Sequence, residues 1–280
     1  MADSPLIRDI SDTARWMAAY REQETSRPDA LFRDPLAGRL AGERGRAIAQ
    51  RMKGRDAWPF TARTLEFDEA ITRFVAAGAD AVVNLAAGLD TRPYRLKLPT
   101  SMRWIEIDLP AIFAEKDQAL ASELPICALE RVPLDLADVG ARRATFARIG
   151  ENAREAVVMS EGLLGYLTEE HVAALADDLA AVQTFRHWVF DMVSPVLLRM
   201  LKRTFAKLDI GMPPVYFAPA EGPAFFEQHG WRVASARSLL RVAAKHKRVN
   251  WFMRLVARLP DSQGKPSRQP WGGVCVLERK

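Results

Sequence analysis

Acidic side chains follow four of the apolar segments that the sequence predicts to be buried strands. The four carboxylates that close these segments are those of Asp90, Asp108, Asp135 and Glu161. In an open parallel sheet the carboxyl ends of the strands lie at one edge, and ligands bind outside that edge. We therefore expect the four carboxylates to surround one ligand site.

The loop after the first apolar segment indicates what kind of ligand this is. Ala86, Ala87 and Gly88 remove side chains where the strand ends, so a ligand can lie against the backbone. Asp108 follows Gly88 by 20 residues, the spacing at which a dinucleotide fold places the acid that binds a ribose. The three-glycine phosphate motif is absent, and Asp90 would repel a phosphate. S-adenosylmethionine fits a ligand with a ribose, no pyrophosphate and some positive charge.

The elements that must position these acids alternate along the chain. Apolar runs at 81–85, 103–109, 126–136, 155–167 and 186–193 predict strands, with two late strands at 230–236 and 271–279. Helix-forming runs lie between them, and others precede them at 13–25, 34–52 and 61–78. This order predicts an α/β fold with a Rossmann-like, seven-stranded, mostly parallel sheet and helices on both faces. Residues 1–60 are expected to form an N-terminal helical lid, and residues 61–280 the main domain.

Composition limits the class of protein and its surroundings. The 280 residues carry a net charge of +5, and no apolar run is long enough for a membrane span. Cys127 and Cys275 are the only cysteines, too few for a disulfide framework or a zinc site, which favours a reducing cytoplasm. The four histidines have no metal spacing, so no metal is expected. Oligomeric state is left open.

Basic residues are concentrated in segment 237–259. Helical wheels place Leu239, Leu240, Val242, Ala243, Phe252, Leu255 and Val256 on an apolar side and leave Arg241, Lys245, Lys247 and Arg248 on a polar one. A solvated helix face is the favoured interpretation of these charges. Attraction of an acidic substrate or of anionic lipid is the alternative.

Several motifs together resemble one known family. The stretches VVNLAAGLDTRPYRL, WIEIDLP, PLDL and SEGLLGYLTEEH are similar to the leucine carboxyl methyltransferase-like family of class I S-adenosylmethionine-dependent O-methyltransferases. The resemblance covers most of residues 10–190 and fades in the C-terminal third. The N-terminal stretch resembles that family's helical lid, and TARTLEFDEAI its arginine-bearing helix.

The resemblance implies a cofactor site for S-adenosylmethionine, formed by Arg63, Ala86, Gly88, Asp108, Asp135, Leu136 and Glu161. Arg63 would bind the methionine carboxylate with its guanidinium fork. Gly88 would lie under the aminoacyl part, and Asp108 would hold the ribose hydroxyls. Asp135 and Leu136 would frame the adenine, and Glu161 would lie near the methionine moiety. Ala86 departs from the family, which more often has glycine there.

The expected reaction is O-methylation of a carboxylate or hydroxyl on a small molecule, plausibly an anion. Arg21, Arg92 and Tyr166 are the candidate acceptor-binding residues, with Arg95 as a further cation. A carboxylate acceptor needs no general base, whereas a hydroxyl would need one, with Glu161 and Tyr166 as nominal candidates. No catalytic residue is assigned.

Two other functions remain open at this point. One is a nicotinamide-dependent oxidoreductase, which would share the Rossmann-like sheet. The other is a non-enzymatic module that binds nucleic acid or membrane through Arg241–Arg248. Acids at the strand ends disfavour a phosphate-binding surface, so no nucleic-acid partner is expected.

Overall fold

The computed structural model describes residues 7, 10–52, 57–206 and 214–280, and a seven-stranded sheet forms its centre. The strands run in the order β3-β2-β1-β4-β5-β7-β6, and β7 alone is antiparallel to its neighbours within this part of the chain. Their bounds are β1 Ala81–Leu85, β2 Arg103–Asp108, β3 Ala128–Pro133, β4 Ala156–Ser160, β5 Phe185–Val193, β6 Trp231–Ser238 and β7 Gly272–Arg279. The predicted mostly parallel Rossmann-like sheet is confirmed.

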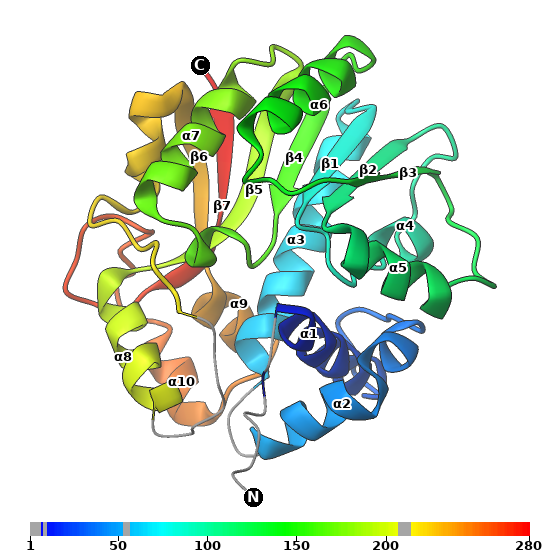
Figure 1. Ribbon diagram of the computed structural model, residues 1–280. Helices are drawn as coiled ribbons and strands as arrows, with labels where there is room; N and C mark the ends of the chain where they lie inside the picture. Colours follow the sequence, from blue (N-terminus) through cyan, green and yellow to red (C-terminus); the bar gives the residue numbers. More distant parts are fainter. Residues whose placement is uncertain (1–6, 8–9, 53–56, 207–213) are drawn as a thin grey trace, which may run out of the picture.

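Helices cover both faces of this sheet and extend beyond its carboxyl edge (Figure 1). Their bounds are α1 Ile10–Thr25, α2 Ala37–Arg51, α3 Trp58–Ala76, α4 Arg92–Arg95, α5 Pro110–Ala119, α6 Val139–Glu151, α7 Glu169–Ala180, α8 Pro195–Ala206, α9 Leu239–Lys245 and α10 Trp251–Val256. Two 3₁₀ helices, η1 Leu164–Tyr166 and η2 Gly222–His229, complete the described elements. Thr168 caps α7 by accepting a hydrogen bond from the His171 amide, as the sequence predicts.

The central strand β1 is apolar on both faces because each face is covered. Val83 and Leu85 pack into the core that the sheet forms with α6, α7 and η2. Val82, one residue out of phase, packs on the opposite face with Phe67 and Ile71 of α3. Alternate strand side chains point to opposite faces, so a continuous apolar run is required here.

The N-terminal helices α1 and α2 have a core of their own, built around Trp16, Tyr20 and Ile48. Leu89, from the loop after β1, packs into this core and joins it to the carboxyl edge of the sheet. Helix α2 begins at Ala37, later than predicted, because the Asp34 carboxylate instead accepts a hydrogen bond from the Leu36 amide. The predicted lid spans 1–60, of which 1–6, 8–9 and 53–56 lie outside the described residues.

The basic segment 237–259 agrees with its prediction only in part, since Arg241, Lys245 and Lys247 are exposed but Arg248 is not. It forms two short helices, α9 and α10, and Lys247 in the connection adopts a positive φ of 58°. Arg248 is not a solvated charge, because its side chain is 7% exposed and forms ion pairs with Glu24 and Asp29. Phe252 and Leu255, predicted to face the core, are more than half exposed. The error arose because an ion pair between distant segments leaves no periodic pattern in the sequence.

Candidate functional site

The loop after β1 and the end of β2 form the polar floor of the site. Ala86 and Gly88 both have a φ of 51°, so the backbone turns sharply where the side chains are smallest. The Gly88 amide donates to Asp108 Oδ2 at 2.6 Å, and the Leu109 amide donates to Oδ1 at 2.7 Å. Burial raises the pKa of Asp108. Each carboxylate oxygen keeps acceptor capacity for the two hydroxyls of a ribose.

Helix α3 places Arg63 between the ends of β4 and β5. Its Nε donates to Glu161 Oε1 at 3.0 Å, and its Nη1 donates to Asp191 Oδ2 at 3.0 Å. Asp191 also accepts a hydrogen bond from the Gly162 amide at 2.6 Å. A Cβ at Gly162, where φ is 71°, would lie 3.3 Å from Arg63 Nη1. The glycine therefore lets the guanidinium approach the backbone closely.

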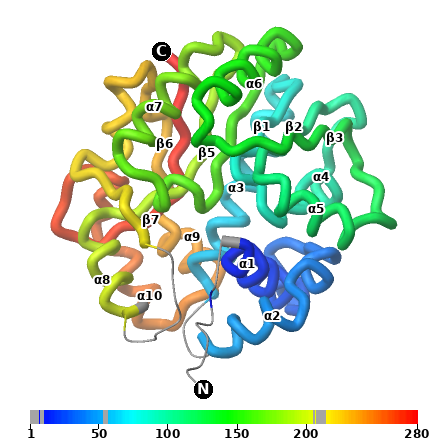
Figure 2. Tube along the Cα trace, in the orientation of Figure 1, coloured from blue at the N-terminus to red at the C-terminus, as the bar shows by residue number. Residues whose placement is uncertain are grey.

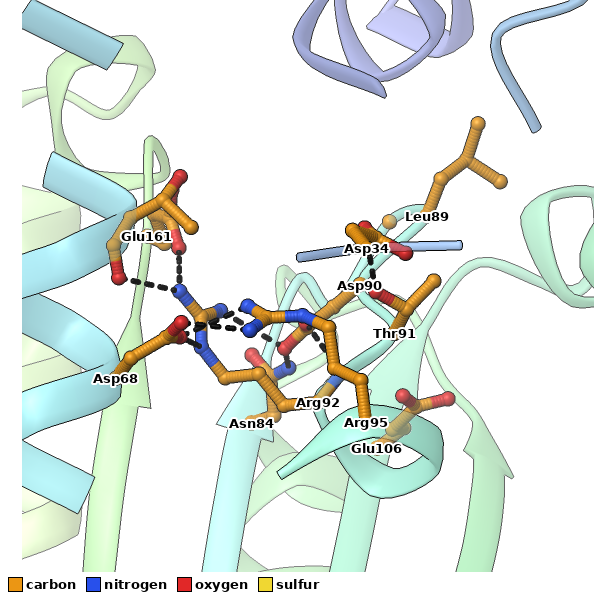
Figure 3. Close-up of polar contacts among 12 residues, drawn as sticks. Asp34, Asp68, Asn84, Leu89, Asp90, Thr91, Arg92, Arg95, Glu106 and Glu161 are labelled. Carbon is orange, nitrogen blue, oxygen red and sulfur yellow. Dashed lines mark hydrogen bonds and ion pairs between the residues drawn. The ribbon is translucent and has the colours of Figure 1, made fainter. Parts of the chain in front are cut away.

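Arg92 joins three segments of the chain behind this floor (Figure 3). Its guanidinium, 3% exposed, donates to Asp68 at 2.7 Å, to Asp90 at 3.0 Å and to Glu161 at 2.8 Å. Arg95 donates two further hydrogen bonds to Asp68. The structure thus fixes the loop after β1 to α3 and to the end of β4.

These ion pairs change the acidity of the carboxyl groups. Burial alone would raise the pKa of Asp90, but the charges of Arg92, Lys116 and Arg95 lower it to about 2. Burial is likewise outweighed at Glu161, where Arg92 and Arg63 lower the pKa. Both groups are therefore ionised at neutral pH.

The predicted acceptor residues lie in different surroundings. Arg21 lines the cavity and donates to Asp34 at 2.8 Å and to the Leu89 carbonyl at 2.7 Å. Arg92 and Arg95 are buried in ion pairs, which favours positioning of the loop over contact with an acceptor. Tyr166, in η1, lines the cavity, and burial raises the pKa of its hydroxyl.

The third strand end forms the other side of the site. Asp135 accepts a hydrogen bond from the Ala137 amide at 2.9 Å, and the Leu136 carbonyl accepts one from Arg142 at 2.7 Å. Both residues line the same cavity as Asp108 and Arg63. The structure therefore brings all seven predicted cofactor residues to one cavity, which lies at the carboxyl edge of the sheet.

Glu106 and Asp108, two residues apart on β2, take different roles. Glu106 is fully buried and accepts hydrogen bonds from Lys116 at 2.7 Å and from Arg131 at 3.0 Å. Asp108 instead lies at the edge of the cavity. Glu106 therefore has a structural role, whereas Asp108 remains available to a ligand.

Sequence reasoning missed two polar residues of the site. Asp191 belongs to β5, and we considered carboxylates only at the ends of the first four strands. Including the fifth strand would have identified Asp191. Asn84 donates from within β1 to Asp90 at 2.8 Å. Asn84 is the one polar residue of an apolar strand, and this is the only sign in the sequence that its side chain has a specific partner.

A cavity of about 2150 Å³ connects these groups with the N-terminal helices and the C-terminal helices. Its lining includes Trp16 and Tyr20 of α1, Phe60 of α3, and apolar side chains of α8 and α10. Within the described ranges, no group of three His, Cys, Asp or Glu side chains is placed to bind a metal ion. No described helix is long and apolar enough to cross a membrane.

Residues 14–180 match the family model described as leucine carboxyl methyltransferase. The chain belongs to this family. A protein of Frankia alni named "Putative S-adenosyl-L-methionine-dependent methyltransferase" is 33% identical over 255 residues, which cover 83% of this chain and 87% of the relative. A Mycobacterium avium protein of the same name is 33% identical over 264 residues, covering 81% of this chain and 80% of that protein.

Solved structures share the fold of this chain. The crystal structure of a "putative methyltransferase" from Thermobifida fusca superposes with a TM-score of 0.57 at 16% identity, covering 97% of each chain. A DUF574 family protein from Streptomyces avermitilis gives a TM-score of 0.53 at 14% identity, covering 94% of this chain and 96% of its own. At these identities the likeness concerns the fold alone.

Proposed function

We propose that the protein transfers the methyl group of S-adenosylmethionine to an oxygen of a small-molecule acceptor. Family membership makes it an S-adenosylmethionine-dependent methyltransferase. The oxygen acceptor and its small size are the proposal, and the observation that carries it is that Glu161 and Tyr166, which line the cavity, are both poor bases. The charged groups beside them fit the cofactor. Three guanidinium groups, of Arg63, Arg92 and Arg95, face four carboxylates, of Asp68, Asp90, Glu161 and Asp191.

This cluster has one net negative charge, and it complements the cofactor. S-adenosylmethionine carries a sulfonium, an ammonium and a carboxylate, so its net charge is positive by one. Glu161 and Asp191 offer acceptors to the ammonium, and Arg63 offers donors to the carboxylate. Asp108 offers an acceptor to each ribose hydroxyl, and Ala86 and Gly88 leave space beside it. Asp135 and Leu136 are assigned to the adenine.

The cofactor, when bound, supplies an electrophilic methyl group. In the displacement a lone pair of the acceptor oxygen forms the new bond to carbon, and the electrons of the broken carbon–sulfur bond stay on sulfur. The protein's contribution is to hold the acceptor in line and to exclude water. The N-terminal helices, which line the cavity from the other side, are the segment we assign to this closure.

The acid–base state of the site favours a carboxylate over a hydroxyl acceptor. A carboxylate is already ionised and releases no proton, whereas a hydroxyl must lose one to a base. Glu161 is a poor base because two guanidinium groups lower its pKa. Tyr166 is a poor base because burial keeps its hydroxyl protonated by raising the pKa. Tyr166 can instead donate a hydrogen bond that orients the acceptor.

The two alternative functions fit less well. Membership of a methyltransferase family disfavours a nicotinamide oxidoreductase. A nucleic-acid module would use Arg241–Arg248, but Arg241 is paired with Asp261 and Arg248 with Glu24 and Asp29. The cytoplasmic location stays a prediction, supported by two cysteines that are buried and unpaired.

Incubation with methyl-labelled S-adenosylmethionine and a library of carboxylic acids and alcohols tests the proposal. We expect label in a small-molecule product that mild base releases, because an ester is hydrolysed and an ether is not. Base-stable label on oxygen would move the acceptor from carboxylate to hydroxyl. Label on nitrogen or carbon would overturn O-methylation.

A further inference from the structure

The cavity is far larger than the cofactor requires. Typical ligand pockets occupy roughly 300–1,000 Å³, whereas this cavity measures about 2150 Å³. A ligand at the upper end of that range, placed against Asp108 and Arg63, leaves more than half of the space free. The free part extends away from the strand ends, toward α8 and α10.

Apolar side chains of two helices line this remote part. Residues of both α8 and α10 line the cavity, and Figures 1 and 2 draw the two helices on the other side of α3 from α1 and α2. The apolar lining side chains of the two helices include Leu197, Leu198 and Leu201 of α8 and Phe252, Met253 and Val256 of α10, and α8 also contributes the polar Lys202 and Thr204. Such a lining offers no fixed hydrogen-bond geometry and binds ligands by removing apolar surface from water.

The apolar lining continues to the outer surface. Phe252, Met200 and Leu259 line the cavity and are 55%, 50% and 59% exposed. Trp251 and Leu255 lie beside them on α10 and are also exposed. Contiguous exposed apolar side chains at the mouth of a cavity mark a binding site.

Exposed basic side chains lie on the same two helices. They are Arg199, Lys202 and Arg203 of α8, Arg254 of α10, and Arg258 just after it, and Lys202 lines the cavity itself. No ion pair with another described residue engages any of the five, in contrast to Arg92 and Arg248. Free basic side chains beside a cavity raise the local concentration of anionic ligands.

We propose that the remote part of the cavity binds the hydrocarbon chain of the methyl acceptor. The acceptor class is an anionic amphiphile, a linear chain that ends in a carboxylate. The chain lies between α8 and α10, and the carboxylate reaches the end near Tyr166 and Arg63. This inference rests on the proposed function, because it places the reacting oxygen at the cofactor.

Binding of straight-chain carboxylates tests the inference without requiring turnover. The protein, saturated with S-adenosylhomocysteine, is titrated calorimetrically with hexanoate, octanoate, decanoate and dodecanoate below their micelle concentrations. We expect Kd to fall by about fourfold for each methylene group that becomes buried. A Kd that does not depend on chain length would overturn the proposal.

Two variants of α10 provide a matched pair. Phe252 and Leu255 are 55% and 54% exposed, but only Phe252 of the two lines the cavity. Phe252→Asp should weaken dodecanoate binding at least tenfold and leave S-adenosylhomocysteine binding within twofold. Leu255→Asp should change both by less than twofold. Equal losses in the two variants would place the chain on the outer surface and overturn the proposal.

Transfer of labelled methyl to the same acids separates this inference from the proposed function. Chain-length-dependent binding that Phe252→Asp abolishes, with label appearing only on nitrogen or carbon, would support the chain site and overturn O-methylation. Base-labile label on short polar acids, without any gain from chain length, would support O-methylation and overturn the chain site.

Discussion

The two ends of the cavity are built in different ways. At the strand ends, Asp108, Arg63 and Glu161 are held by hydrogen bonds to backbone amides or to opposite charges. Between α8 and α10 the lining is apolar and has no such fixed geometry. A cofactor with a ribose and charged groups requires fixed donors and acceptors, whereas a hydrocarbon chain requires only volume. At the strand ends, function therefore depends on which residue type is present. Between α8 and α10 it depends mainly on the size of the apolar side chains.

The largest effect should follow from removing the centre of the polar network. Arg92→Met leaves the carboxylates of Asp68, Asp90 and Glu161 short of a partner in a buried setting. We expect the free energy of unfolding to fall by about 3–5 kcal/mol, measured by urea denaturation. Arg154→Met, at an 87% exposed side chain paired with Asp80, should cost less than about 1 kcal/mol. Equal losses of unfolding free energy in the two variants would show that the ion pairs of Arg92 do not stabilise the strand-end region.

Asp108→Asn should weaken both binding and stability. The amide keeps one acceptor oxygen in place of two, so S-adenosylhomocysteine should bind about 1.5–3 kcal/mol more weakly by calorimetry. The unfolding free energy of the ligand-free protein should fall by about 1–3 kcal/mol, because the amide NH2 faces one of the two backbone N–H groups that donate to the carboxylate. A large loss of stability with unchanged affinity would make Asp108 a structural residue.

The ion pairs at the strand ends should also make the free energy of unfolding depend on pH in the acid range. The pKa of Asp90 lies at about 2 in the folded protein, below its ordinary value of 3.8. Ionised Asp90 therefore contributes stability that is fully present above about pH 4 and is lost as the pH falls toward 2. The expected contribution is roughly 2 kcal/mol.

Urea denaturation of the wild type and of Asp90→Asn between pH 2 and 6 measures this contribution. The variant should be less stable at pH 6, and the difference should shrink toward pH 2. A difference that stays constant across the range would assign the loss to altered packing rather than to charge.

The smallest effect concerns backbone strain at Ala86. Its φ of 51° is left-handed, which costs a residue with a Cβ about 1–2 kcal/mol, and glycine relieves this at some cost in entropy. Ala86→Gly should raise the unfolding free energy by about 0.5–1 kcal/mol in thermal and urea denaturation. Ala87→Gly, at a buried position whose φ is not positive, should lower it by a similar amount. Destabilisation by both would mean that the Ala86 methyl packs favourably.

Sequence and structure agree best where the pattern is local. The apolar run of β1 and the acids at successive strand ends are short-range features, and each was predicted. Family membership, predicted from motifs such as GLDTR, was confirmed as well. The start of α2 was misplaced because the Asp34 side chain has partners on α1 and after β1.

The sequence by itself determined the α/β order, the class of cofactor and the residues that belong at the strand ends, because strand period and loop composition are read locally. Only the tertiary structure decided which charged side chains are solvent-exposed and which are buried in ion pairs. The sequence predicts that Arg92 binds the acceptor and that Arg248 is solvated, yet both are buried by carboxylates from distant segments. The tertiary structure also decided that α8 and α10 meet across an apolar space. Pairing over a long sequence separation depends on how the chain folds back, and no local pattern encodes it.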